Sequence, residues 1–282
     1  MNILNQVKYM NNLTPAEQQF AAFIGEHTDL IMEGSLQEVL RAAYISKSLL
    51  LRFCKKLGLS GFKELKVRLA QENSPEPEAV DANFPFTEKD SQKTIAQKLQ
   101  QLYINTINDT MSFLQPDQLW EIVLRLQKAR RIAIFAQAQN GTLAENFQLR
   151  LMSLGYRVSF NESEYKQRCE ALMADKDSVA LILSYSGHIG FLTDLLNIFK
   201  QRHVPTVWIG RAGNQQLEEA TDYQLYISDK ENLRHRIAQF ASNLAMQYTL
   251  DLLYSCLFKA DYQRNLQYTR DNLPYLDTRN LQ

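Results

Sequence analysis

Cysteine is scarce in this chain, and its scarcity argues against two kinds of stabilising framework. The 282 residues include only three cysteines, Cys54, Cys169 and Cys256, which lie far apart in the sequence. An odd number without CxxC or metal-ligand spacing indicates neither a set of disulfides nor a structural zinc site. We therefore expect small buried thiols, and we predict no metal and no cofactor.

Long apolar runs and an excess of one charge are also missing. No stretch reaches the ~18 apolar residues of a membrane span, and the N-terminal "MNILNQVKYMNN" lacks the apolar core of a signal peptide. We expect a cytoplasmic protein that does not bind a membrane. The 31 basic and 31 acidic residues balance, but a global balance can hide a local excess.

Length and composition fit about two globular domains, since domains typically hold roughly 100–200 residues. Residues 1–72 read as an all-helical domain, and residues 73–91 read as a linker because they hold three prolines and five acidic residues. Residues 92–260 read as an α/β domain. Residues 261–282 form a polar tail that we expect to be loosely held.

Helix start and stop signals divide the first domain. "TPAE" at 14–17 and "SLQE" at 35–38 are capping boxes, each followed by apolar residues at helical spacing. Ser46 can cap a third helix that Gly58 ends, and Ser60 can begin a fourth. The segment around the second and third helices is therefore a helix, a short turn and a helix.

Charge is polarised within this helical domain. Residues 41–70 carry eight basic and one acidic side chain, whereas residues 1–40 carry one basic and five acidic. A basic helix after a short turn fits the major groove of DNA and its phosphates. The alternative is a solvated basic face on an ordinary helical bundle. The candidate DNA contacts are Ser46, Lys47, Ser48, Leu49, Arg52, Lys55 and Lys56.

The same segment resembles a known family. "LTPAEQQFAAFIGEH" followed by "SLQEVLRAAYISKSLLLRFCKKLGLSGFKELKVRLA" is similar, over residues 13–70, to the N-terminal domain of RpiR/MurR-type bacterial transcription regulators. The resemblance implies that residues 46–56 enter the DNA groove. Tyr44 stands where the family usually has Gly, and we expect it to force a different turn. Leu49 stands where the family usually has Thr and could meet a thymine methyl group.

From residue 131 the pattern changes to short β-branched runs that alternate with helical segments. This alternation predicts a parallel sheet covered by helices on both faces. The expected strands are 131–136, 156–160, 178–184, 204–210 and 223–228, and helices are expected at 92–114, 117–129 and 232–258 in addition to those between the strands.

"ILSYSGHIG", residues 182–190, ends the strongest strand and opens a helix. Hydroxyls and free backbone amides at the carboxyl edge of a parallel sheet suit an anion such as phosphate. Taken alone, the motif could equally be a helix-capping serine loop.

In its context the motif resembles the SIS (sugar isomerase) domain, which RpiR-type regulators carry after their helix-turn-helix. The resemblance implies that Ser184, Ser186 and Gly187 bind a phosphosugar. His188 could contact the phosphate or be an exposed polar residue.

Other positions depart from the SIS pattern. Ile189 replaces the usual Thr. In the first loop, "AQAQNG", Ala136 and Ala138 replace glycines, and Asn140 replaces a serine. Gln139 and Asn140 can still form hydrogen bonds, with a different geometry. The ligand could therefore be a phosphosugar-like metabolite, or the pocket could be retuned to another ligand or vestigial.

Catalysis is not expected, because a sugar isomerase needs a placed general base. Glu145, Glu162 and Glu164 could lie near the sheet edge, but none sits in a motif that assigns it a role. Arg236 matches an arginine common in the family, for which a place near the ligand, a dimer contact and a surface salt bridge all remain open.

The sequence as a whole predicts a DNA-binding transcription regulator that senses a phosphosugar-like effector. The alternatives are a regulator with a vestigial pocket and a phosphosugar isomerase. A homodimer or homotetramer is expected, because helix-turn-helix proteins read two half-sites of double-stranded DNA. The helices at 92–129 and 232–258 are the candidates for subunit contacts.

Overall fold

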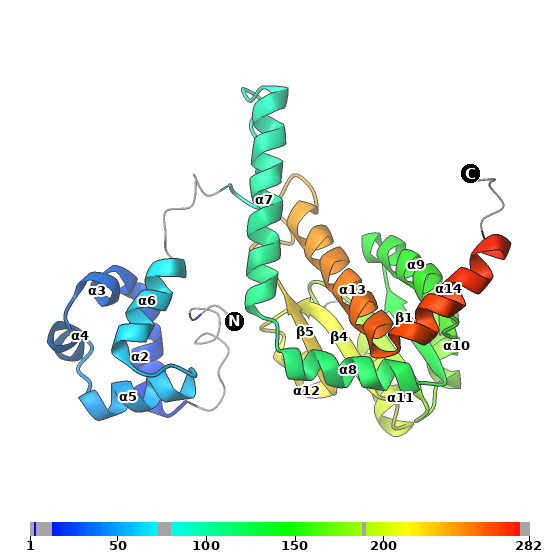
Figure 1. Cartoon of the computed structure of the whole chain (residues 1–282), viewed down its shortest axis with the longest axis horizontal. Coiled ribbons are helices and arrows are strands. Elements are labelled where there is room, and N and C mark those ends of the chain that lie inside the picture. The colour runs from blue at the N-terminus through cyan, green and yellow to red at the C-terminus, as the bar shows by residue number, and fades with distance from the viewer. Residues whose placement is uncertain (1–2, 4–12, 73–79, 188–189, 277–282) are drawn as a thin grey trace. The chain divides into compact units, whose positions relative to one another are not determined.

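A computed structural model describes residue 3 and residues 13–72, 80–187 and 190–276 of the chain. The chain divides into two compact units, Met1–Val80 and Asp81–Gln282, which are described separately (Figure 1).

The first unit is helical, as predicted. Glu17 accepts a hydrogen bond from the Thr14 amide at 2.8 Å, and Glu38 accepts one from the Ser35 amide at 2.7 Å, so both capping boxes are confirmed. The core packs around Phe20 and other apolar side chains. The helices are α2 (Pro15–Glu26), α3 (Thr28–Glu33), α4 (Leu36–Ala42), α5 (Lys47–Lys56) and α6 (Phe62–Glu72).

The second unit contains a five-stranded sheet in the order β2-β1-β3-β4-β5, with every neighbouring pair parallel. The predicted parallel sheet is thus confirmed. All five expected strands form, although the second is only two residues long. The strands are β1 (Arg131–Ala136), β2 (Val158–Ser159), β3 (Ser178–Leu183), β4 (Thr206–Arg211) and β5 (Tyr223–Ile227).

Helices cover both faces of this sheet, because successive strand residues point to opposite sides. Ile132 and Ile134 face the core under α8, α9 and α13, whereas Ala133 and Phe135 face the core under α10, α11 and α12. The helices are α7 (Gln92–Ser112), α8 (Pro116–Lys128), α9 (Gln139–Met152), α10 (Glu164–Met173), α11 (Leu192–Gln201), α12 (Gln215–Ala220), α13 (Phe240–Ala260) and α14 (Tyr262–Leu276).

The start of the closing helix and the fate of the tail differ from expectation. Helix α13 begins at Phe240 instead of residue 232, because the buried Glu231 carboxylate accepts hydrogen bonds from the Ala241 and Ser242 amides and fixes the helix start there. The expected polar tail is helical in α14, where the buried Asn265 amide donates to the Phe258 carbonyl at 3.1 Å.

The expected linker is also partly packed. Residues 73–79 lie outside the described residues. Beyond them, Ala82 is buried, and the Asn83 carbonyl accepts a hydrogen bond from the Ile237 amide at 2.9 Å. Residues 81–86 therefore belong structurally to the second unit. In the part of the chain that is described, none of the helices combines the length and apolar character that a membrane span needs.

Candidate functional sites

The helix-turn-helix motif consists of α4, a turn and α5. The Ser46 hydroxyl accepts a hydrogen bond from the Leu49 amide at 3.2 Å and so caps α5 as predicted. In the turn, Tyr44 has φ of 53° and is 95% exposed. Tyr44 therefore lies in the left-handed region that glycine reaches more readily, and the expectation that it changes the turn relative to the family stays a prediction. Non-Gly residues reach this region at some cost in backbone strain.

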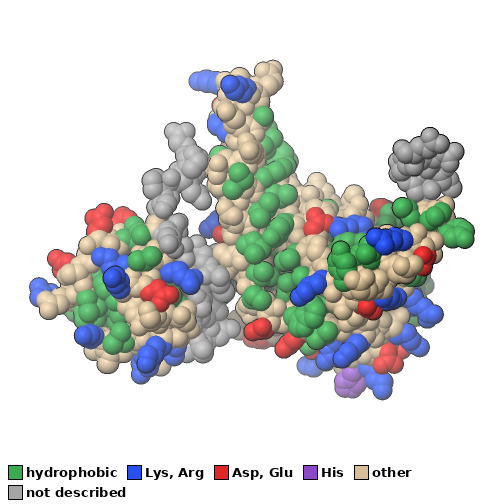
Figure 2. Space-filling model, viewed as in Figure 1, with side chains coloured by type: hydrophobic (Ala, Val, Ile, Leu, Met, Phe, Trp, Pro, Cys, Tyr) green, Lys and Arg blue, Asp and Glu red, His purple; other side chains and the backbone are tan. Residues whose placement is uncertain are grey.

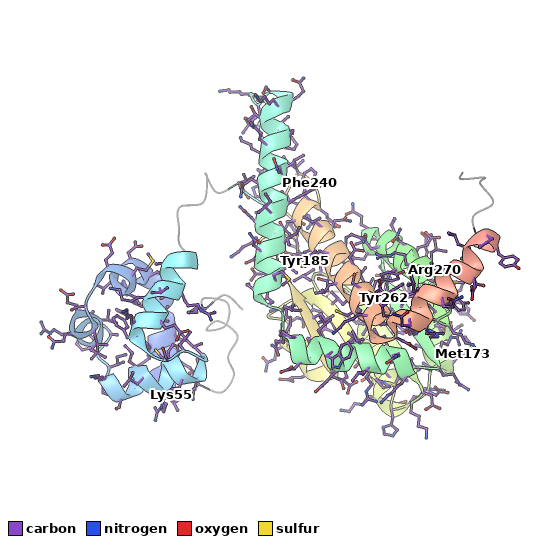
Figure 3. All side chains as sticks on the ribbon, in the orientation of Figure 1. Lys55, Met173, Tyr185, Phe240, Tyr262 and Arg270 are labelled. Carbon is purple, nitrogen blue, oxygen red and sulfur yellow. The ribbon has the colours of Figure 1, made fainter. Side chains whose placement is uncertain are left out.

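Helix α5 separates its apolar and polar residues. Leu50, Phe53 and Cys54 are buried, and burial raises the pKa of the Cys54 thiol to about 11. Leu49 is partly buried against the same core, so only part of its side chain is available to a DNA base. The exposed side of the helix carries Lys47, Ser48 and Lys55; the last is labelled in Figure 3.

Two of the candidate DNA contacts are already paired. The Lys56 ammonium donates to the Glu17 carboxylate at 2.7 Å, and Arg52 Nε donates to it at 3.1 Å. Glu17 is fully buried, and the Lys56 hydrogen bond, followed by the one from the Thr14 amide, lowers its pKa to about 2. This carboxylate thus fixes the basic helix α5 to α2.

A hollow of about 590 Å³ lies between the loops that follow β3 and β4. The structure brings Ser186 and Gly187 of the predicted motif together with Arg211 and Asn214, which sequence reasoning missed. The lining residues are Ser186, Gly187, Gly190, Thr193, Arg211, Ala212, Gly213, Asn214, Gln215 and Gln216.

Arg211 is the charged residue among these lining residues. Its guanidinium lies 5.8 Å from the centroid of the Tyr185 ring, and it forms no ion pair with any described residue. Such a cation in a hollow lined otherwise by hydroxyls, amides and small residues suits an anionic, hydroxyl-rich ligand. The only sequence signal for Arg211 was its place at the end of β4, beside β3 in the sheet.

Ser184 has an internal role. It is 3% exposed, and its hydroxyl accepts a hydrogen bond from the Gly187 amide at 3.1 Å, while its carbonyl accepts one from the Trp208 indole at 2.9 Å. Ser184 does not line the hollow. It shapes the loop that presents Ser186 and Gly187.

Gly187 is required by its surroundings. Its φ is 73°, and an added Cβ would lie 2.3 Å from Asn214 Nδ2 and 2.6 Å from Leu217 Cδ1. The Asn214 side chain accepts a hydrogen bond from the Leu217 amide, so it is held in place against the glycine. The two loops that line the hollow therefore pack directly on each other.

The first loop does not contribute to this hollow. Gln139 is exposed at the start of α9, and Asn140 Nδ2 donates to the Leu183 carbonyl at 3.4 Å. Ala138 has φ of 52° and ψ of −132°, a conformation that normally requires glycine. The buried Gln167 side chain holds the end of β1 by bonding to the amide and carbonyl of Ala136. His188 and Ile189 lie outside the described residues.

Arg236 is not on the ligand hollow. It forms an ion pair with the buried Glu231, and its side chain is 13% exposed. Of the roles left open for it, a salt bridge is observed, but one that is largely buried.

The comparisons with known proteins agree with this architecture. A family model of the rpiR-type helix-turn-helix domain matches residues 1–76, and a model of the SIS domain matches residues 125–255. A helix-turn-helix domain joined to a SIS domain defines a class of transcription regulators.

An HTH-type transcriptional regulator of Haemophilus influenzae is 30% identical to this chain over 264 residues, which cover 92% of this chain and 91% of the relative. One from Caldanaerobacter subterraneus is 24% identical over 281 residues, 99% of both chains. The chain therefore belongs to the rpiR family of helix-turn-helix transcription regulators.

Two solved structures share the fold. The NanR protein of Vibrio vulnificus, complexed with ManNAc-6P, superposes with a TM-score of 0.60 at 17% identity, covering 99% of this chain and 100% of NanR. The sugar isomerase domain of an RpiR transcription factor from Sphaerobacter thermophilus has a TM-score of 0.55 at 16% identity, covering 62% of this chain and 96% of that domain.

Proposed function

We propose that this regulator binds double-stranded DNA through α5 and responds to a phosphosugar-like metabolite held in the hollow between the β3 and β4 loops. The observation that carries the ligand proposal is Arg211, a cation without a described acidic partner in a hollow lined by hydroxyl and amide groups. NanR, which shares the fold, was solved with a sugar phosphate. The DNA-binding domain would then be residues 1–72, and the ligand-binding domain would be residues 92–260.

The DNA-binding proposal is supported by the exposed, basic side of α5. Lys47, Ser48 and Lys55 are exposed and can approach phosphates and base edges, whereas Arg52 and Lys56 are oriented by Glu17. Since DNA is the target, we place the protein in the cytoplasm.

We propose that the chain is not an enzyme. Among the described residues that line the hollow, no carboxylate and no histidine is present to act as a general base. Of the acids considered from the sequence, Glu164 is paired with Arg168 at 3.0 Å. A vestigial pocket remains the alternative to a sensor, and the ligand experiment below separates the two.

We also propose that the chain forms at least a homodimer through α7. Tyr103, Ile104 and Met111 on this helix are each about two-fifths exposed, and Figure 2 shows hydrophobic side chains gathered along it. Exposed apolar stripes of this kind mark interfaces. A second copy is the partner that a helix-turn-helix regulator needs to read two half-sites.

A thermal-shift screen tests the ligand proposal. The panel contains N-acetylmannosamine 6-phosphate, N-acetylglucosamine 6-phosphate, glucose 6-phosphate, fructose 6-phosphate, ribose 5-phosphate and inorganic phosphate. A compound at a hundred times its Kd stabilises by about 2.7 kcal/mol, which for a protein of this size is roughly 5–10 °C. We expect such a shift in the native protein, its loss in Arg211→Gln, and its retention in Arg202→Gln, where the exposed arginine lies at the end of α11.

A second pair of variants tests the loop itself. Gly187→Ala drives a Cβ into Asn214 and should abolish the shift, whereas Gly25→Ala on α2 meets no atom within 4 Å and should retain it. If none of the compounds raises the melting temperature of a protein that still binds the DNA upstream of its own gene, the pocket is vestigial.

A further inference from the structure

A chain of hydrogen bonds and ring contacts connects the loop that lines the ligand hollow to residues 81–86, where the chain enters the second unit. These contacts begin at Tyr185, which lies between Ser184 and the hollow-lining Ser186 and is 7% exposed. The Arg211 guanidinium lies over its ring at 5.8 Å, and the Arg211 amide donates to the Tyr185 carbonyl at 3.0 Å. A ligand that contacts Ser186 and Arg211 therefore acts on two residues that touch Tyr185.

The contacts continue into residues 231–237, the irregular segment before α13. The Tyr185 hydroxyl donates to the Glu231 carbonyl at 2.8 Å across 46 residues of sequence. Burial is the main reason that the pKa of Tyr185 lies well above its usual range, so this hydroxyl keeps its proton and remains a donor. The Glu231 carboxylate in turn holds Arg236 and the first amides of α13. The position of Tyr185 thus helps to set the position of residues 231–237.

The last contacts of this chain are made by residues 81–86, which we name the entry strap. The Asn83 side-chain oxygen accepts a hydrogen bond from the Asn232 amide, and its carbonyl accepts one from the Ile237 amide at 2.9 Å. The Phe84 and His235 rings lie 4.8 Å apart, and the Phe86 and Phe240 rings lie 6.3 Å apart. Tyr185 and Phe240, at the two ends of this set of contacts, are labelled in Figure 3.

We propose that Tyr185 and Asn83 are positioning residues that couple the ligand hollow to the entry strap and, through residues 73–80 that precede it, to the DNA-binding domain. The proposal rests on the proposed function, since it assumes a ligand in the hollow. Ligand contacts on Ser186 and Arg211 stabilise the loop arrangement in which Tyr185 holds Glu231, and so favour the fastened strap. A ligand shifts such an equilibrium only by its differential contacts with the two states, and these contacts supply the difference.

A fastened strap restricts where the DNA-binding domain can reach. With residues 81–86 held, eight residues, 73–80, separate α6 from the second unit. At roughly 3.5 Å per residue they span at most about 28 Å. With the strap released, fourteen residues, 73–86, could extend to about 49 Å. Because paired helix-turn-helix domains must meet two half-sites at a fixed spacing, this difference in reach changes DNA affinity.

Hydrogen exchange of the full-length protein tests, without any ligand, whether the Tyr185 hydroxyl stabilises the contacts of residues 231–237 with the entry strap. Tyr185→Phe removes the hydroxyl and keeps the ring. We expect the Asn232 and Ile237 amides to exchange roughly tenfold faster in it, the size of effect that one lost hydrogen bond allows. Tyr165→Phe, in which an exposed tyrosine of α10 loses its hydroxyl, is the matched control and should change neither amide. Unchanged exchange in Tyr185→Phe would overturn the inference.

The coupling itself is read from DNA affinity. The DNA upstream of the protein's own gene is titrated with and without the panel compound that gives the largest thermal shift. We expect the ratio of the two Kd values to fall toward one in Tyr185→Phe and in Asn83→Ala, while the Kd for the compound changes by less than about threefold. Asn83→Asp keeps the acceptor for the Asn232 amide and should restore the ratio.

The possible failures can be told apart. If no panel compound binds, the proposed sensing function fails, and the inference falls with it. If a compound binds and changes DNA affinity equally in the native protein, Tyr185→Phe and Asn83→Ala, the function stands and only the coupling route is wrong. Loss of compound binding in Tyr185→Phe would also overturn the inference, because the residue would then only shape the hollow.

Discussion

Replacing Glu17 with glutamine should destabilise the DNA-binding domain more than the loss of a helix cap explains. The carboxylate caps α2 through Thr14 and also accepts hydrogen bonds from Lys56 and Arg52 on α5. A pKa lowered from 4.5 to about 2 corresponds to about 3.4 kcal/mol of stabilisation at neutral pH. The Arg52 side chain is 60% exposed and that of Lys56 27%, so water screens both pairs and we expect about 2 kcal/mol.

The stabilisation that the Glu17 carboxylate supplies depends on pH. The folded pKa of Glu17 lies below its ordinary value, so the stabilisation is present above about pH 5 and is lost as the pH falls toward 2. The difference between the native protein and Glu17→Gln should therefore be largest near neutral pH and should shrink at pH 3. This behaviour is expected only if the ionised carboxylate supplies the stability.

The two units can be observed separately in the full-length chain. Both tryptophans, Trp120 and Trp208, belong to the second unit, so tryptophan fluorescence follows that unit while far-UV circular dichroism follows both. Unfolding of the first unit is therefore seen by circular dichroism and not by tryptophan fluorescence. Glu17→Gln should lower the melting temperature of this unit by roughly 10 °C, since a domain of this size loses about 4–8 °C per kcal/mol.

Glu38→Gln is the control, because Glu38 completes the other capping box at an exposed position without an ion pair to α5. An equal loss of stability in Glu17→Gln and Glu38→Gln, or a loss that does not change between pH 7 and pH 3, would refute the role assigned to the Glu17 ion pairs.

Three further outcomes are expected. Lys55→Ala should reduce the slope of log K against log salt for DNA binding by roughly 0.9, one phosphate contact, and Lys200→Ala on α11 should not; equal slopes would remove Lys55 from the interface. Ala138→Gly should raise the unfolding free energy by about 1 kcal/mol in denaturant titrations, since it relieves a glycine-type conformation; a loss of stability would contradict the strain. Ile104→Glu should lower the molar mass measured by light scattering, whereas Leu149→Glu, also exposed, should leave it unchanged; an unchanged mass in both would move the interface away from α7.

The sequence predicted the sheet well because its three central strands, β1, β3 and β4, are nearly continuous apolar runs. All six residues of β3 are buried, and the register pairs all six residues of β1 with those of β3. Elements with weaker signals were missed. Helix α3 has only six residues, and α14 is a polar helix held by one buried amide, that of Asn265. Helix α3 is too short to show a helical period, and α14 is polar on average and carries Pro274 within it.

The candidate sites were predicted where they are local in sequence. Ser186 and Gly187 of the S-x-S-G motif line a hollow, although their ligand-binding role stays a prediction, and the cap at Ser46 was read from the sequence. Arg211 was missed because it reaches the hollow only through the adjacency of β3 and β4. The partners of Glu17 lie 35 and 39 residues away, a distance over which a sequence pattern gives no pairing.

The edges of the sheet limit how this protein can associate. One edge strand, β2, offers only two residues of paired backbone, and α7 lies at the other edge, where the Thr110 hydroxyl accepts a hydrogen bond from the Ser228 amide just past β5. Strand addition needs a long open edge. Assembly by sheet extension, and the fibrous aggregation that follows from it, is therefore disfavoured by the fold. The homodimer proposed through α7 would use a helical surface instead and would leave the sheet unchanged.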